Sequence, residues 1–191
     1  MERKYALSLI IAFSLIAGIL IGCFIHITQE KEINLLKNSG FEEGVGDNPA
    51  YWYKAMVPAE GLNMSWVSDI RHSGSRSVCI FNTHVYNVTV SNNWAQNVYD
   101  VPIGKELELI GWVKMENAEN VAIVIQCWGK NNELLAFGTT QTTQLLSGTC
   151  NWTKCTASIT VPEDTDHITV RAVLTGTGKV WFDDIKLLVK K

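Results

Sequence analysis

The sequence predicts an all-β fold, a two-sheet antiparallel β-sandwich, preceded by one N-terminal hydrophobic helix. Three observations support the sandwich. Short segments rich in β-branched and aromatic residues recur from residue 64 onward, Gly, Asn, Asp or Pro lies between most of them, and no long amphipathic helix pattern follows residue 30. Short strands separated by turn residues at this spacing are typical of a β-sandwich or barrel.

The expected strands have one strongly apolar face and one mixed face, as a sandwich requires. In segment 167–174, alternate residues are apolar and share one face of the expected strand. They are Ile168, Val170, Ala172 and Leu174. Thr169, Arg171 and Val173 take the opposite face, where we expect any binding function. The expected strands are 64–69, 77–82, 94–101, 106–115, 121–128, 134–140, 154–161, 167–174 and 179–189.

The N-terminal helix is predicted from residues 5–29, which contain no Asp, Glu, Lys or Arg and are long enough to cross a bilayer. We therefore divide the chain into a signal anchor or signal segment, 1–29, and a β-sandwich domain, 30–191. Because Arg3 and Lys4 precede this segment, we expect the N-terminus to lie in the cytoplasm and the domain to lie at the cell surface. Two alternatives stay open, a lipoprotein whose Cys23 is lipidated and a protein secreted after cleavage.

Charge and cysteine content exclude some classes of function. The formal net charge is −3 and no basic stripe appears, so no nucleic-acid partner is expected. The cysteines beyond residue 30 permit two disulfides in three possible pairings, or they are small buried thiols on strands. The sequence leaves this choice open for Cys79, Cys127, Cys150 and Cys155.

Several stretches appear in an order that is known from one group of proteins. They are NLLKNSGFEEG at 34–44, RHSGSRSVCIFN at 71–82, WAQNVYDVPIGKELELIGWVKME at 94–116 and VWFDDIKL at 180–187. Together they resemble carbohydrate-binding modules of families 4, 9 and 22, which are galactose-binding-like jelly rolls. The resemblance covers about residues 33–189. It implies non-catalytic binding of a polysaccharide or a cell-surface glycan.

The resemblance also implies a structural Ca²⁺ ion that joins the first corner to the last strand. Glu42 and Asp183 would supply carboxylates, and Ser73 and Arg76 would supply loop oxygens. Calcium prefers six to eight oxygen ligands of these kinds. Without the resemblance, the same acidic residues read as solvated loop charges and turn caps.

Candidate sugar contacts come from the aromatic and amide side chains of the expected mixed faces, because sugar rings stack on aromatic side chains and their hydroxyls need polar partners. Neighbouring strands supply most of them, and a loop adds Tyr86 as a possible rim. The candidates are Trp94, Gln96, Gln126, Trp128, Arg171 and Tyr86.

Catalysis is not expected. Glycosidases need two carboxylates that flank one bond, whereas neighbouring residues such as Glu42 and Glu43 point to opposite faces of a strand. The alternative function is a surface structural or protein-interaction domain with no sugar site on the same fold. An aromatic-lined groove favours sugar binding, and burial of Trp94 and Trp128 favours the alternative.

Overall fold

The computed structural model describes residues 32–55 and 60–190. Ile33–Lys191 form one compact unit with its own hydrophobic core, so we expect this unit to fold without the preceding segment. The predicted anchor, residues 1–29, lies outside the described residues. Within the described ranges, no helix is both long and apolar enough to cross a membrane.

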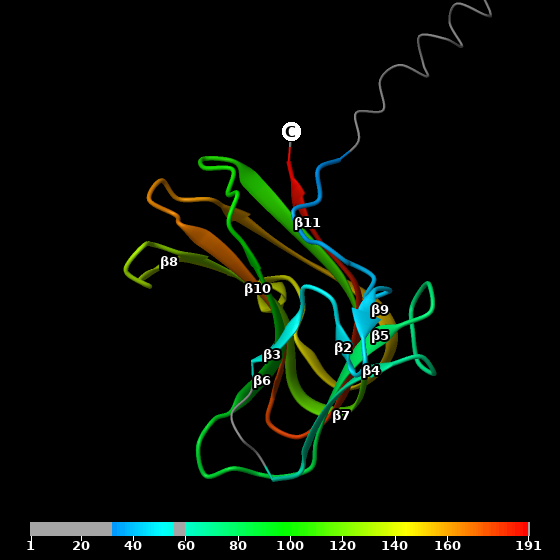
Figure 1. Cartoon of the computed structure of the whole chain (residues 1–191). Helices are drawn as coiled ribbons and strands as arrows, with labels where there is room; N and C mark the ends of the chain where they lie inside the picture. Colours follow the sequence, from blue (N-terminus) through cyan, green and yellow to red (C-terminus); the bar gives the residue numbers. More distant parts are fainter. Residues whose placement is uncertain (1–31, 56–59, 191) are drawn as a thin grey trace, which may run out of the picture. The chain divides into compact units, whose positions relative to one another are not determined.

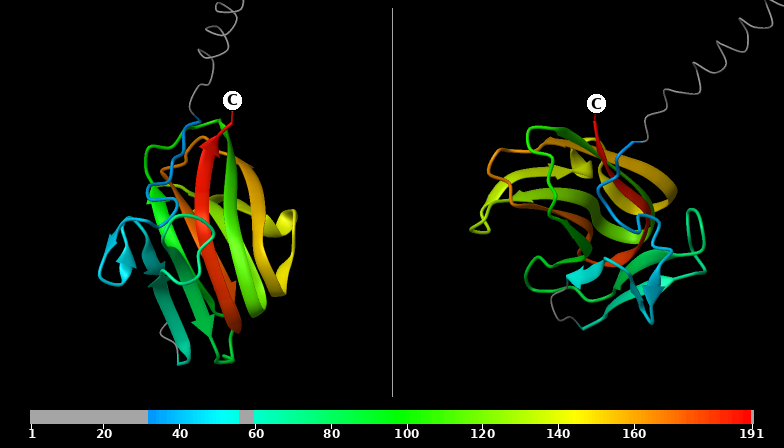
Figure 2. Two further views of the ribbon diagram at one scale, coloured as in Figure 1. Left: turned by 90° about the vertical axis from the view of Figure 1, so that its right-hand side faces the viewer. Right: turned by 45° about the horizontal axis from the view of Figure 1, so that its top comes forward.

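The strands form two curved layers, and all their pairings are antiparallel. Layer A contains β4 (Leu62–Val67), β5 (Ser77–Asn82), β11 (Gly178–Val189), the first half of β7 (Glu106–Trp128) and β9 (Leu146–Thr160). The left view of Figure 2 shows these strands side by side.

Layer B contains β3 (Tyr53–Ala55), β6 (Ser91–Val98), β10 (His167–Thr175), the second half of β7 and β8 (Leu134–Thr139). Figure 1 shows these strands on the side opposite β4, β5 and β11. A small hairpin of β1 (Gly44–Val45) and β2 (Asn48–Pro49) follows the first corner, and a single 3-10 turn, η1 (Thr140–Thr142), follows β8.

The long strand β7 corrects the expectation of two separate sheets. The expected strands 106–115 and 121–128 are one strand, which pairs with β11 in its first half and with β10 in its second. Its pairing with β9 is irregular between Met115 and Val121, and Asn117 has a positive φ of 48° there. The main sheet is therefore one continuous antiparallel sheet that curls over the core; the all-β antiparallel prediction is confirmed.

The core lies between the layers and confirms the alternation of β10. Ile168, Val170, Ala172 and Leu174 are fully buried in it. A second, smaller apolar cluster lies on the opposite face of layer B. It consists of Ala122, Val124 and Val173.

The four cysteines of the domain are free thiols, so the disulfide alternative is wrong for this structure. Cys79, Cys127 and Cys155 are buried, as expected of small apolar strand residues. Burial raises the pKa of Cys127 and Cys155 to about 11, which keeps these thiols protonated and unreactive.

Candidate functional site

A groove of about 240 Å³ runs over the outer face of layer B. It crosses β6, β10 and β7 and reaches β8 and η1. Its lining residues are Ser91, Asn93, Asn120, Ala122, Val124, Gln126, Phe137, Gln141, Arg171, Val173 and Thr175. Most come from alternate positions of neighbouring strands, since alternate side chains share a face.

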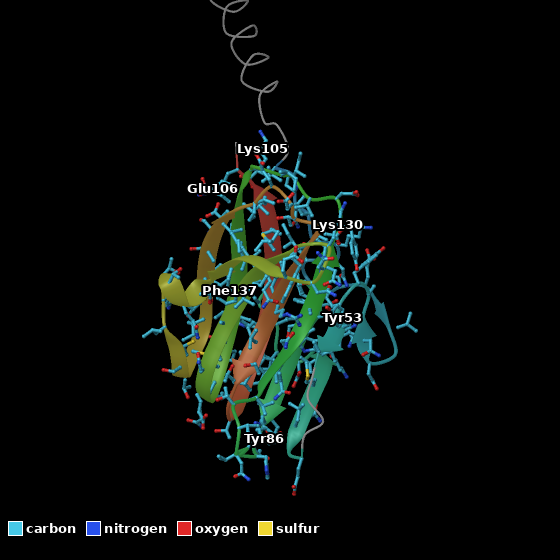
Figure 3. All side chains as sticks on the ribbon, turned by 90° about the vertical axis from the view of Figure 1, so that its left-hand side faces the viewer. Tyr53, Tyr86, Lys105, Glu106, Lys130 and Phe137 are labelled. Carbon is cyan, nitrogen blue, oxygen red and sulfur yellow. The ribbon has the colours of Figure 1, made fainter. Side chains whose placement is uncertain are left out.

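The groove has an apolar floor and one aromatic wall, and a second aromatic ring lies on the same face beyond the lining residues. The cluster Ala122, Val124 and Val173 forms the floor. Phe137 on β8 is 53% exposed, and Tyr53 on β3 is 42% exposed. Figure 3 shows these two rings on opposite sides of the same face. Flat apolar surfaces of this kind suit the faces of sugar rings.

Three polar side chains from three strands are joined across the groove. The Arg171 Nε atom donates to Gln126 Oε1 at 2.7 Å, and Arg171 Nη1 donates to Asn93 Oδ1 at 2.9 Å. Beside them, Asn97 Oδ1 accepts hydrogen bonds from the Tyr53 hydroxyl at 3.2 Å and from Thr169 Oγ1 at 2.9 Å. Such a network presents fixed amide and guanidinium groups to a ligand's hydroxyls.

Of the predicted contacts, the structure brings Gln126 and Arg171 together in this groove. The interpretation of Trp94 and Gln96 is wrong. Trp94 pairs with the core residue Ala172 and is fully buried. Gln96 is 3% exposed, and its amide bonds the backbone N–H and C=O of Lys37 at 2.8 and 2.9 Å. Both side chains serve the fold.

Trp128 and Tyr86 lie away from the centre of the groove. Trp128 ends β7, is half-buried and does not line the groove. Tyr86 lines a neighbouring depression of about 410 Å³ that shares Asn120 and Thr175 with the groove. Its hydroxyl lies 2.9 Å from the Glu60 carbonyl oxygen, so it holds the loop at this end.

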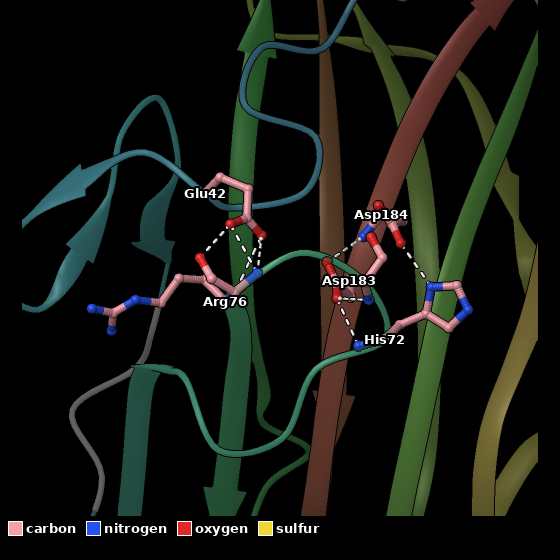
Figure 4. Close-up of polar contacts among 7 residues, drawn as sticks. Glu42, His72, Arg76, Asp183 and Asp184 are labelled. Carbon is pink, nitrogen blue, oxygen red and sulfur yellow. Dashed lines mark hydrogen bonds and ion pairs between the residues drawn. The ribbon is translucent and has the colours of Figure 1, made fainter.

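The four predicted metal ligands lie at a different place, which we call the corner latch: Glu42, Asp183 and the loop 71–76. The loop bonds Glu42 at one end and Asp183 at the other (Figure 4). The Glu42 carboxylate accepts hydrogen bonds from the N–H of Ser75 at 2.9 and 3.0 Å and of Arg76 at 3.2 Å. Gly74 has a φ of +58°, and a Cβ there would collide with the Glu42 carboxylate. Glycine is thus required for this close approach.

Asp183 closes the other half of the corner latch. Its buried carboxylate accepts hydrogen bonds from the N–H of His72 at 2.8 Å, Ser73 at 3.1 Å and Asp184 at 2.7 Å. Burial raises the pKa of Asp183 to about 6, against the opposing effect of these N–H donors. His72 stacks on Trp112 with ring centroids 3.8 Å apart and bonds Asp184 through Nδ1 at 2.7 Å.

In the corner latch, backbone N–H groups bond both carboxylates that the resemblance assigns to calcium. The N–H of Ser73 donates to Asp183 and the N–H of Arg76 donates to Glu42, and N–H groups themselves cannot ligate a cation. Among the residues that the structure describes, no three His, Cys, Asp or Glu side chains are arranged to hold a metal ion. Calcium binding stays a prediction of the resemblance.

Sequence reasoning missed Tyr53, Asn93, Asn97 and Phe137. The register of β6 against β10 pairs Asn93 with Val173 and Asn97 with Thr169, so these asparagines share the groove face. In the sequence, the available signal was that alternate residues of this stretch are small or polar, namely Asn93, Ala95 and Asn97. This pattern is typical of a strand face that does not enter the core. Trp94, the aromatic residue of β6, has the opposite parity, and aromatic residues are the usual stacking partners of sugars.

The sequence matches no protein-family model, and no curated protein resembles it. Solved structures do match the fold. The xylan-binding domain CBM22-1 of Paenibacillus barcinonensis Xyn10C has a TM-score of 0.56 and 13% identity, over 86% of this chain and 99% of that one. TmCBM61, solved with β-1,4-galactotriose, has a TM-score of 0.53 and 18% identity, over 83% and 99%.

The enzymatically active domain of tailspike protein 4 from bacteriophage CBA120 also matches, with a TM-score of 0.64 and 13% identity. The match covers 83% of this chain and only 22% of the tailspike chain. The domain thus has the β-sandwich fold of carbohydrate-binding modules, which the sequence resemblance predicted. Family 22 is among the families that the sequence resembles, whereas the match to CBM61 was not expected.

Proposed function

We propose that residues 30–191 bind a polysaccharide without cleaving it, in the groove over β6, β10, β7 and β8. The observation that carries this proposal is that one open groove combines an apolar floor, the exposed ring of Phe137 and a fixed polar network. The fold adds support, because two of its structural matches are a xylan-binding domain and a module solved with galactotriose.

A non-catalytic role is part of the proposal. The described residues that line the groove include no Asp or Glu, so they offer no pair of carboxylates for glycoside hydrolysis. The acidic residues Glu42 and Asp183 instead hold the corner latch. We further propose display outside the cytoplasm through residues 1–29, as the charge pattern of that segment predicts.

Burial of Trp94 is the observation that favours the alternative, a protein-interaction domain with no sugar site. Sugar binding does not depend on Trp94, however, because Phe137 supplies an exposed aromatic ring in the groove and Tyr53 supplies another on the same face beside it. The two functions make different predictions for Phe137.

We expect Phe137→Ala to weaken polysaccharide binding about 2- to 13-fold, since one aromatic contact contributes about 0.5–1.5 kcal/mol beyond its buried area. Affinity gel electrophoresis of residues 30–191 with a panel of neutral and acidic polysaccharides measures this. The matched control is Phe81→Ala, because Phe81 is also exposed on a strand, at 40%, but lies outside the groove. Retardation by no polysaccharide would contradict the proposal and favour the alternative.

A further inference from the structure

Arg171 occupies the middle of the groove. It lies on β10 between Ala95 of β6 and Val124 of β7, and its half-buried side chain faces the groove. Since strands flank it on both sides, its backbone position is fixed by the sheet.

Two neutral amide oxygens orient the Arg171 guanidinium. Gln126 Oε1 accepts from Nε at 2.7 Å, and Asn93 Oδ1 accepts from Nη1 at 2.9 Å. A guanidinium has five N–H donors. Both N–H groups of Nη2, and one of Nη1, have no partner among the described residues and remain for a ligand.

No carboxylate neutralises this charge within the described residues. None of their ion pairs includes Arg171, and no acidic side chain lines the groove. Acidic side chains line two other depressions and not the groove. Glu119 lines the neighbouring depression and accepts a hydrogen bond from Thr177, whereas Glu133, Glu163 and Asp164 line another depression.

From this arrangement we infer that the groove takes an acidic polysaccharide and that Arg171 binds the carboxylate of a uronic acid unit. This inference rests on the proposed function and names its ligand class. A guanidinium presents parallel N–H donors that match a planar carboxylate. The ring of the same sugar unit then lies over the apolar floor beside Phe137. A neutral sugar leaves the positive charge of Arg171 without a counterion.

The probe is polygalacturonate, compared with the same polymer after methyl esterification, which removes the charge and keeps the sugar chain. We expect residues 30–191 to bind the free acid at least about tenfold more tightly than the ester, as a charged hydrogen bond is roughly twice as strong as a neutral one. Neutral xylan and dextran sulfate complete the panel, and titration calorimetry measures each affinity.

The variants separate the effect of the paired N–H donors of the guanidinium from the effect of its charge. Arg171→Gln should remove the preference for the free acid. Arg171→Lys keeps the positive charge without the paired N–H donors and should lose part of the preference for the free acid. Lys186→Gln is the matched control, because this exposed lysine of β11 lies outside the groove. It should bind as the wild type does. Melting curves confirm that each variant is folded.

Equal binding of the free acid and the ester by wild-type protein would overturn the inference while leaving the proposed function intact. The same holds if Arg171→Gln keeps the full preference. If dextran sulfate binds more tightly than polygalacturonate, and Arg171→Lys binds it as tightly as the wild type does, the site recognises sulfate. That result would overturn the inference that Arg171 binds a carboxylate. Binding of no polymer would overturn the proposed function itself.

Discussion

Replacing Trp94 by alanine should lower the free energy of unfolding by about 3–5 kcal/mol, the range for truncating a large core aromatic. Trp94 is fully buried between the layers, and its indole Nε1 donates to the Cys79 carbonyl oxygen of β5 at 3.2 Å. Removing it leaves a cavity that the surrounding strands cannot close without moving. Because natural domains are stable by only about 5–15 kcal/mol, this is a large share of the total.

Urea unfolding of residues 30–191 measures this loss. The matched control is Trp128→Ala, which removes the same ring from a half-buried position at the end of β7 and should cost less. A stable Trp94→Ala protein that has lost polysaccharide binding would restore the sequence-based interpretation of Trp94 as a sugar contact and contradict the structure.

The second large effect is a pH dependence of stability at Asp183. Its pKa is about 6 in the folded protein and 3.8 as the ordinary value, so the folded state holds the proton more tightly. This stabilises the folded state below about pH 4, and the stabilisation is lost as the pH rises to about 6. Two pKa units correspond to about 3 kcal/mol.

Asp183→Asn removes this titration. We therefore expect the free energy of unfolding of the wild type, minus that of the variant, to fall by about 2 kcal/mol between pH 4 and pH 6, which is most of the total change. The neighbouring Asp184 and His72 are present in both proteins, so their titrations largely cancel in the difference. A difference that stays constant across this range would show that Asp183 has the same pKa folded and unfolded.

The same two proteins test calcium. If the corner latch holds an ion, as the resemblance predicts, chelator should lower the melting temperature of the wild type and leave that of Asp183→Asn unchanged. Equal melting temperatures of the wild type with and without chelator would contradict calcium binding.

Local patterns were sufficient to predict most strands. The segments 77–82 and 179–189 agree with β5 and β11 to within one residue. The union of 106–115 and 121–128 into β7 was not predictable, because Asn117 and its polar neighbours read as a turn. In the structure Asn117 takes a positive φ while the strand pairing continues around it.

The candidate site was harder to predict, because a face is defined by the register between strands and not by one strand alone. Arg171 and Gln126 were found because the apolar parity of β10 and β7 is plain. In β6 both parities carry polar residues, and only the pairing of Trp94 with Ala172 assigns Trp94 to the core. The role of Glu42 was similarly ambiguous, since a carboxylate that binds calcium and one that bonds backbone N–H groups look alike in sequence.

Whether the groove on layer B binds the polysaccharide can be observed residue by residue in an NMR titration. ¹⁵N-labelled residues 30–191 are titrated with an oligosaccharide cut from the polymer that binds best. We predict that the amide signals of Asn93, Gln126 and Arg171 shift together, while those of Lys114 and Trp181, on layer A, stay in place. Shifts confined to layer A or to the corner latch would contradict the claim.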